Sequence, residues 1–89
     1  MTDANRWAVE YERRALRDLR QLDPPVRQRV VAAIDRLAAG EQTADVKRLQ
    51  GQPLFRLRVG DWRVLFRQDG ERLIITVVRT LPRGRAYDR

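Results

Sequence analysis

The chain has 89 residues, of which 43% are apolar and 35% charged, and this composition suits a folded domain with one core rather than a disordered segment. It contains no cysteine and no histidine, which excludes disulfides, thiolate catalysis, the commonest general base and the commonest metal ligand. The net charge is +7, and the whole excess lies in residues 46–89, which contain eleven basic and four acidic residues. Such a concentration of positive charge is typical of a protein that binds nucleic acid.

Residues 7–22 predict a strand followed by a helix. The segment 7–11 (WAVEY) is short and contains Trp, Val and Tyr, which favour strands. In residues 12–22 apolar side chains recur three or four positions apart, which indicates a helix with one apolar side. These side chains are Ala15, Leu16, Leu19 and Leu22.

A second helix is predicted directly after the first. Asp23 is a suitable N-cap, Pro24 suits the first turn, and Gly40 is typical of the position just after a helix. The apolar stripe of this helix consists of Val26, Val30, Ile34 and Leu37. Because the connection is so short, the two helices are expected to form an antiparallel hairpin.

The second half of the chain predicts a loop and three strands. Residues 41–52 are expected to form the loop, after which the apolar pattern changes to a period of two. The strands are expected at residues 54–59, 62–68 and 72–79. Gly60-Asp61 and Asp69-Gly70 between them are signals for two-residue hairpin turns.

These two turns predict a strand register. The first pairs Val59 with Trp62, Leu57 with Val64 and Phe55 with Phe66, and the second pairs Phe66 with Leu73, Val64 with Ile75 and Trp62 with Val77. All of these residues are apolar and lie on one face, which is expected to pack on the helices. The predicted fold is therefore α+β, with a four-stranded, antiparallel-dominated sheet in the chain order β-α-α-β-β-β and a two-helix hairpin on one face.

The same register predicts a cationic opposite face. Arg58 lies directly across from Arg63 with Thr76 next in the row, and Arg56 is two residues from Arg58 on the same strand. Opposed like charges destabilise a sheet, but an anion between the guanidiniums would turn the repulsion into attraction, and arginine forks match phosphate. The alternative is a solvated face with splayed side chains.

Residues 79–89 form a basic tail. Tyr87 lies among its arginines and is the one plausible proton-transfer group near the cationic face. Simple packing of Tyr87 against the sheet is the alternative.

No segment is long and apolar enough to span a membrane, which needs about 18–20 residues, and residues 1–7 do not have the pattern of a signal peptide. The acidic residues are scattered, so no metal site is indicated. We therefore expect residues 1–89 to form a single domain of a cytoplasmic protein, with no metal and no small-molecule cofactor.

Taken together, these motifs resemble the RelE/ParE superfamily of bacterial toxins, in its RelE-like ribonuclease branch. The resemblance covers essentially the whole chain and is most specific in four motifs. These are Arg56-Leu57-Arg58, the Gly60-Asp61 turn, the run Trp62 to Phe66, and Arg83 to Tyr87.

The resemblance implies the toxin of a type II toxin–antitoxin system, a metal-free endoribonuclease that cuts mRNA in the ribosomal A site. In that family the 2′-hydroxyl attacks the adjacent phosphorus. By motif position, Arg56 and Arg58 match residues that grip the phosphate, and Arg63 matches the arginine that stabilises the transition state. Arg83 matches the residue proposed at the leaving 5′-oxygen, and Tyr87 matches a general base or a base-stacking group. Further RNA contacts are expected from Lys47, Arg48, Arg79 and Arg85.

The chain departs from the family pattern in three ways. Leu81-Pro82 stands where many relatives have Gly-His, arginines replace lysines, and no histidine is present. The expected partners are a cognate antitoxin, mRNA and ribosomal RNA. Two alternatives remain open: a ParE-like inhibitor that binds DNA gyrase without hydrolysis, and an inactive nucleic-acid-binding relative.

Overall fold

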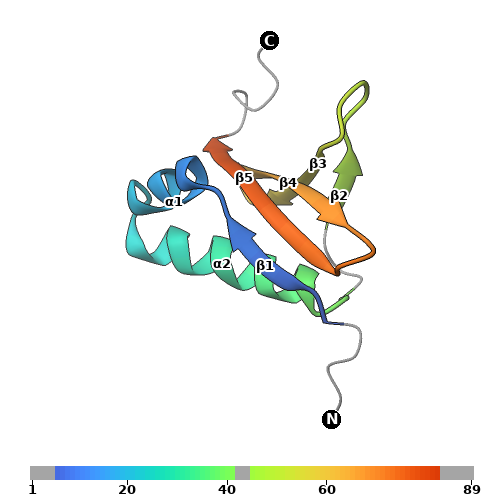
Figure 1. The fold of residues 1–89 in the computed structure, drawn as a ribbon. Helices are drawn as coiled ribbons and strands as arrows, with labels where there is room; N and C mark the ends of the chain where they lie inside the picture. The colour runs from blue at the N-terminus through green and yellow to red at the C-terminus, as the bar shows by residue number, and fades with distance from the viewer. Residues whose placement is uncertain (1–5, 42–44, 83–89) are drawn as a thin grey trace.

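The computed structural model describes residues 6–41 and 45–82, in which both helices cover one face of a five-stranded sheet (Figure 1). The elements are β1 (Ala8–Tyr11), α1 (Arg13–Arg20), α2 (Pro24–Ala38), β2 (Asp45–Arg48), β3 (Phe55–Val59), β4 (Trp62–Asp69) and β5 (Ile74–Pro82). The sheet order is β1-β5-β4-β3-β2. The α+β class and the helical hairpin are as predicted, but the sheet is mixed and has five strands rather than four.

The additional strand is β2, in the segment that was predicted to be a loop. It pairs antiparallel with β3 at the edge of the sheet, with Asp45 opposite Arg58 and Lys47 opposite Arg56. All four of its residues are exposed. The prediction failed because an exposed edge strand has no buried face, and so it carries no alternating apolar pattern.

At the other edge, β1 runs parallel to β5. Ala8 aligns with Ile74 and Tyr11 with Val77, and the backbone N–H of Glu12 donates to the carbonyl of Val77 at 2.9 Å. The helices lie between these two strands in the chain, as a parallel connection requires. Figure 1 shows the first and last strands of the described chain side by side.

Each helix buries its apolar side against the sheet. The predicted stripes are largely confirmed: Ala15, Leu19 and Leu22 are buried at α1, and Val30 and Ile34 are buried in α2. Leu16 is the exception, with 41% of its surface exposed. From the sheet, the core receives Leu57, Val64, Phe66, Ile75 and Val77.

The connection between the helices is held by Arg27. Its Nε donates to the carbonyl of Leu19 at 2.9 Å, and its Nη2 donates to that of Leu22 at 3.0 Å. These hydrogen bonds engage carbonyls at and just after the end of α1, where the Leu19 carbonyl also accepts the backbone N–H of Leu22 at 3.1 Å. Asp23 precedes α2 as expected, but its side chain makes no capping hydrogen bond. Gly40 follows α2 with a φ of 83°, as its predicted role requires.

The predicted β3–β4 hairpin is confirmed in full. Val59 pairs with Trp62, Leu57 with Val64 and Phe55 with Phe66, and the two phenyl rings stack with centroids 5.5 Å apart. Gly60 has a φ of 57°. A glycine with positive φ at the first turn position suits the right-handed twist of a two-residue hairpin.

The predicted β4–β5 turn is wrong, because the loop comprises residues 70–73 and Asp69 pairs with Ile74. The Asp69 Oδ1 atom accepts hydrogen bonds from the backbone N–H groups of Glu71 (3.1 Å) and Arg72 (3.2 Å). The aspartate thus stabilises a longer turn through its side chain, a common alternative to the Asp-Gly hairpin.

A β-bulge shifts the pairing of β4 with β5 by one further residue. Phe66 pairs with Val77, whereas Leu65 pairs with Arg79, so Val78 is an additional residue in β5. Beyond the bulge the pairs are Val64 with Thr80, Arg63 with Leu81 and Trp62 with Pro82. Because of the longer turn and the bulge, the predicted pairs Phe66–Leu73, Val64–Ile75 and Trp62–Val77 are all wrong.

None of the helices in the described part of the chain is long and apolar enough to cross a membrane.

Candidate functional site

The predicted arginines lie together on the sheet face opposite the helices, which we call the basic face and define by Arg56, Arg58 and Arg63. Arg58 in β3 is directly opposite Arg63 in β4, and Arg56 is opposite Leu65, as the sequence predicts. Leu81, and not Thr76, is next to Arg63 in the row. The longer β4–β5 loop accounts for most of this change, and the bulge at Val78 shifts the pairing by one further residue.

Arg63 is the most buried cation of the basic face. Only 6% of its surface is exposed, and its Nε has no hydrogen-bond acceptor among the residues that the structure describes. One guanidinium nitrogen, Nη1, donates to the carbonyl of Trp62 at 3.5 Å, at the limit of a hydrogen bond. Within residues 6–41 and 45–82 no carboxylate pairs with Arg63. A charged group in this position retains unused donors that fit an anion.

Arg56 and Arg58 share a single carboxylate, that of Asp45 in β2. Arg56 Nη2 lies 3.1 Å from Oδ1 of Asp45, and Arg58 Nη1 lies 3.5 Å from Oδ2. The side chain of Arg56 is 12% exposed and that of Arg58 is 48% exposed. Sequence reasoning missed Asp45, because the interaction depends on a strand that the apolar pattern did not indicate.

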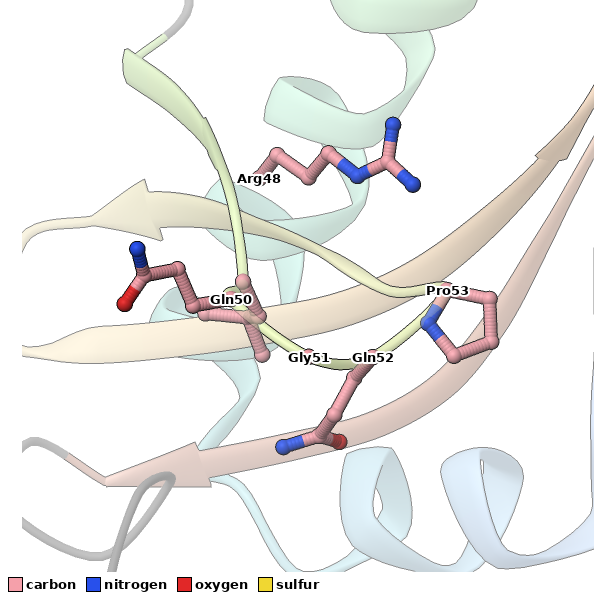
Figure 2. Close-up of a pocket in the computed structure, with 6 residues that line it drawn as sticks. Arg48, Gln50, Gly51, Gln52 and Pro53 are labelled. Carbon is pink, nitrogen blue, oxygen red and sulfur yellow. The ribbon is translucent and has the colours of Figure 1, made fainter.

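Lys47 extends the basic face onto β2, whereas Arg48 is opposite Phe55 and so lies on the other face of this edge strand. Lys47 is opposite Arg56, and the Arg48 guanidinium lies over the ring of Phe55 at 5.9 Å from its centroid, within the range of a cation–π interaction. Arg48 also borders a shallow pocket at the β2–β3 loop, formed by Arg48, Leu49, Gln50, Gly51, Gln52 and Pro53. Figure 2 shows the side chains of Gln50 and Gln52 leaving the loop at separate points, between Arg48 and Pro53. The pocket wall therefore offers amides and one cation, with no group suited to acid–base chemistry.

Arg79 is held by α1. Its Nε donates to Oδ2 of Asp18 at 2.8 Å and its Nη2 donates to Oδ1 at 3.2 Å, and this hydrogen bonding to Asp18 raises the pKa of Arg79. The backbone N–H of Thr80 donates to the same carboxylate at 2.9 Å. Arg79 was predicted to contact RNA, and in this structure its guanidinium is engaged by Asp18.

The other predicted site residues, Arg83, Arg85 and Tyr87, lie outside the described residues. The other tyrosine, Tyr11, lies in β1, at the edge of the sheet farthest from β2, and is half-buried against the core. Burial raises the pKa of the Tyr11 phenol, and the negative charge of Asp35 adds to the increase. Among the described residues, no group of three potential metal ligands is present.

The arrangement suits the binding of a phosphodiester. Three guanidiniums from two adjacent strands converge on one face, and arginine forks donate to two phosphate oxygens at once. Fixed cations that face a phosphate also stabilise the additional negative charge of a phosphorane-like transition state. Catalysis at such a site rests on positioning and electrostatics.

Comparison with protein families gives one match. The model described as the ParE toxin of type II toxin–antitoxin systems, parDE, matches residues 9–87. A search of curated protein sequences gave no significant match.

Solved structures with the same fold include toxins and their complexes. The archaeal RelE–RelB complex from Pyrococcus horikoshii matches with 27% identity and a TM-score of 0.74, over 90% of this chain and 98% of the other. The RelBE2 toxin–antitoxin complex from Mycobacterium tuberculosis matches with 28% identity and a TM-score of 0.73, over 88% and 99% of the chains. The isolated Escherichia coli RelE toxin shares the fold, with a TM-score of 0.74 at 18% identity over 91% and 88%.

Proposed function

The chain belongs to the family of ParE toxins of type II toxin–antitoxin systems, and we propose that this toxin is an endoribonuclease that cleaves mRNA at the ribosomal A site. The observation that carries the proposal is the basic face, above all Arg63. This guanidinium is almost completely buried, lies beside two further arginines, and has no carboxylate partner among the described residues.

The proposed reaction needs no metal. The 2′-oxygen of the substrate forms a bond to the adjacent phosphorus and loses its proton, and the bond from phosphorus to the 5′-oxygen breaks. The 5′-oxygen takes up a proton, so the products carry a 2′,3′-cyclic phosphate and a 5′-hydroxyl. Arg56 and Arg58 hold the phosphate, and Arg63 stabilises the charge that accumulates on its free oxygens.

Residues of the tail complete the proposed site. Arg83 stabilises the leaving 5′-oxygen, and Tyr87 either accepts the proton of the 2′-hydroxyl or stacks on a base. An arginine is a poor proton donor at its normal pKa, so its contribution is mainly electrostatic. Lys47, Arg48 and Arg85 are proposed to contact RNA outside the scissile phosphate, where they add affinity without sequence preference.

The proposed protein partner is a cognate antitoxin. The P. horikoshii and M. tuberculosis structures are toxin–antitoxin complexes in which the chain similar to this one is seen with its antitoxin. For the present chain, an antitoxin with acidic residues would complement the basic face.

The test is induced expression followed by mapping of mRNA 5′ ends. Wild type is expected to arrest growth and to produce cuts in phase with the codons. Arg63→Ala should remove both effects, whereas Arg72→Ala should retain them, because Arg72 is exposed in the β4–β5 loop, away from the basic face. Thermal unfolding of purified Arg63→Ala separates loss of chemistry from loss of the fold.

A second candidate is inhibition of DNA gyrase by binding, and the match to the ParE toxin model favours it. Under this alternative the mRNA of arrested cells stays intact, Arg63→Ala still arrests growth, and the purified protein blocks supercoiling by gyrase. That combination of results would exclude the nuclease.

A further inference from the structure

We propose that Asp45 is an internal competitor of RNA: its carboxylate occupies the place of a substrate phosphate on Arg56 and Arg58, and RNA binds by displacing it. The inference rests on the proposed function, since it concerns the same basic face, and adds a residue that limits RNA affinity. It begins from an unusual arrangement, in which one carboxylate uses its two oxygens on two different arginines.

The strand register explains how Asp45 reaches both cations. Asp45 is directly opposite Arg58, and Arg56 is the diagonal neighbour two residues along β3. Diagonal neighbours on one face of a sheet are within reach of long side chains. The contacts are 3.1 Å from Oδ1 to Arg56 Nη2 and 3.5 Å from Oδ2 to Arg58 Nη1. Two oxygens of one phosphate would bridge the same two guanidiniums in the same way.

The bridge is placed so that a ligand in solution can replace it. The Asp45 side chain is 50% exposed, and β2 is an edge strand with β3 as its one neighbour in the sheet. Exposed ion pairs contribute little free energy because water and salt compete for both partners. A polyanion that contacts several cations together can therefore displace a single exposed carboxylate.

The displaced carboxylate has other cations nearby. Asp45 and Arg58 line the same hollow as Arg29 and Arg36 of α2, a space of about 260 Å³. Arg29 and Arg36 have no carboxylate partner among the described residues. A shift of Asp45 toward α2 would free Arg56 and Arg58 for RNA while the carboxylate remains near positive charge.

Arg63 is the cation of the basic face that Asp45 does not contact. It lies opposite Arg58, but no ion pair joins it to Asp45. In the free protein, two arginines thus share one carboxylate and a third has none among the described residues, and this third is the one proposed to act on the transition state. Asp45 accordingly weakens RNA binding more than it weakens the chemical step.

The test measures binding of a short 2′-O-methyl RNA, which lacks the attacking hydroxyl and stays intact. Asp45→Asn should bind this RNA about threefold to tenfold more tightly than wild type at low salt, because RNA no longer has to break the two ion pairs. The slope of log affinity against log salt concentration should steepen by about 0.7, the value for one more phosphate of a single strand that the protein neutralises.

Asp61→Asn is the matched control. It removes one negative charge from the β3–β4 turn, at the same end of the sheet, and Asp61 forms no ion pair within the described residues. Its affinity should stay within about twofold of wild type. Asp45→Ala, with its fold checked by thermal unfolding, should repeat the result for Asp45→Asn.

Equal affinities of the Asp45 and Asp61 variants would overturn the proposal, and so would weaker binding by Asp45→Asn, which would mean that Asp45 positions the arginines for RNA. Failure of the nuclease proposal gives a different result. If Asp45→Asn binds RNA more tightly but the wild type makes no codon-phased cuts in cells, the proposal for Asp45 stands and the nuclease proposal is rejected. No binding by wild type or either Asp45 variant would reject both.

Discussion

Asp18 in α1 accepts two parallel hydrogen bonds from the guanidinium of Arg79 in β5, and the Asp18 side chain is 14% exposed. The same carboxylate accepts the backbone N–H of Thr80. Val78, the additional residue of the bulge, immediately precedes this pair. The contact joins the helical layer to the sheet next to the bulge, where the alternation of β5 side chains between the two faces is interrupted.

Asp18→Asn is expected to lower the free energy of unfolding by about 1–3 kcal/mol, because it leaves a partly buried guanidinium without its counter-charge. Urea unfolding measures this change. Asp23→Asn is the control: the Asp23 side chain makes no capping hydrogen bond, so its effect should stay within about 0.5 kcal/mol. Equal effects of the two substitutions would mean that the ion pair contributes nothing to stability.

Gly60→Ala is expected to destabilise the protein by about 1–2 kcal/mol, because Gly60 has a φ of 57°, which is unfavourable for residues with a Cβ. A Cβ at this position meets no atom within 4 Å, so the loss of stability comes from the backbone conformation and not from a steric clash. Gly70→Ala is matched to it, since Gly70 also has open space and lies outside the positive φ region. Thermal unfolding should show a clear decrease for Gly60→Ala alone, and a similar decrease for both would refute the assignment.

The raised pKa of Tyr11 predicts a pH dependence of stability. The folded state keeps the phenol proton to higher pH than the unfolded state, whose pKa is near the usual 10.0. The contribution of Tyr11 to the free energy of unfolding is therefore fully present below pH 10, and it is lost as the pH rises through the pKa of the folded state. Unfolding free energies between pH 9 and about 11.5 should fall less steeply for Tyr11→Phe than for wild type. Parallel curves for the two proteins would contradict the prediction.

The sequence predicted the parts of the fold that depend on local signals. The helices follow from apolar spacing, Pro24 and Gly40, and the β3–β4 register follows from a two-residue turn at Gly60-Asp61. Arg58 opposite Arg63 is a direct consequence of that turn. This part of the site is therefore predictable from the sequence alone.

The remaining features depend on contacts that local patterns do not encode. Asp69-Gly70 is a strong hairpin signal, yet the Asp69 side chain stabilises a longer loop. The bulge at Val78 then shifts β5 by one further residue, directly before Arg79, which pairs with Asp18 of a distant helix. Asp45 was missed for a similar reason, because its strand is exposed and polar.

Because β1 pairs with β5, formation of the sheet depends on residues far apart in the chain. Ala8 and Ile74 must meet before the edge of the sheet can close, and such non-local contacts slow folding. During synthesis, β1 has no strand to pair with until residues 74–77 have emerged from the ribosome. The sheet that carries the proposed site is thus completed only when nearly all of the described chain has been translated.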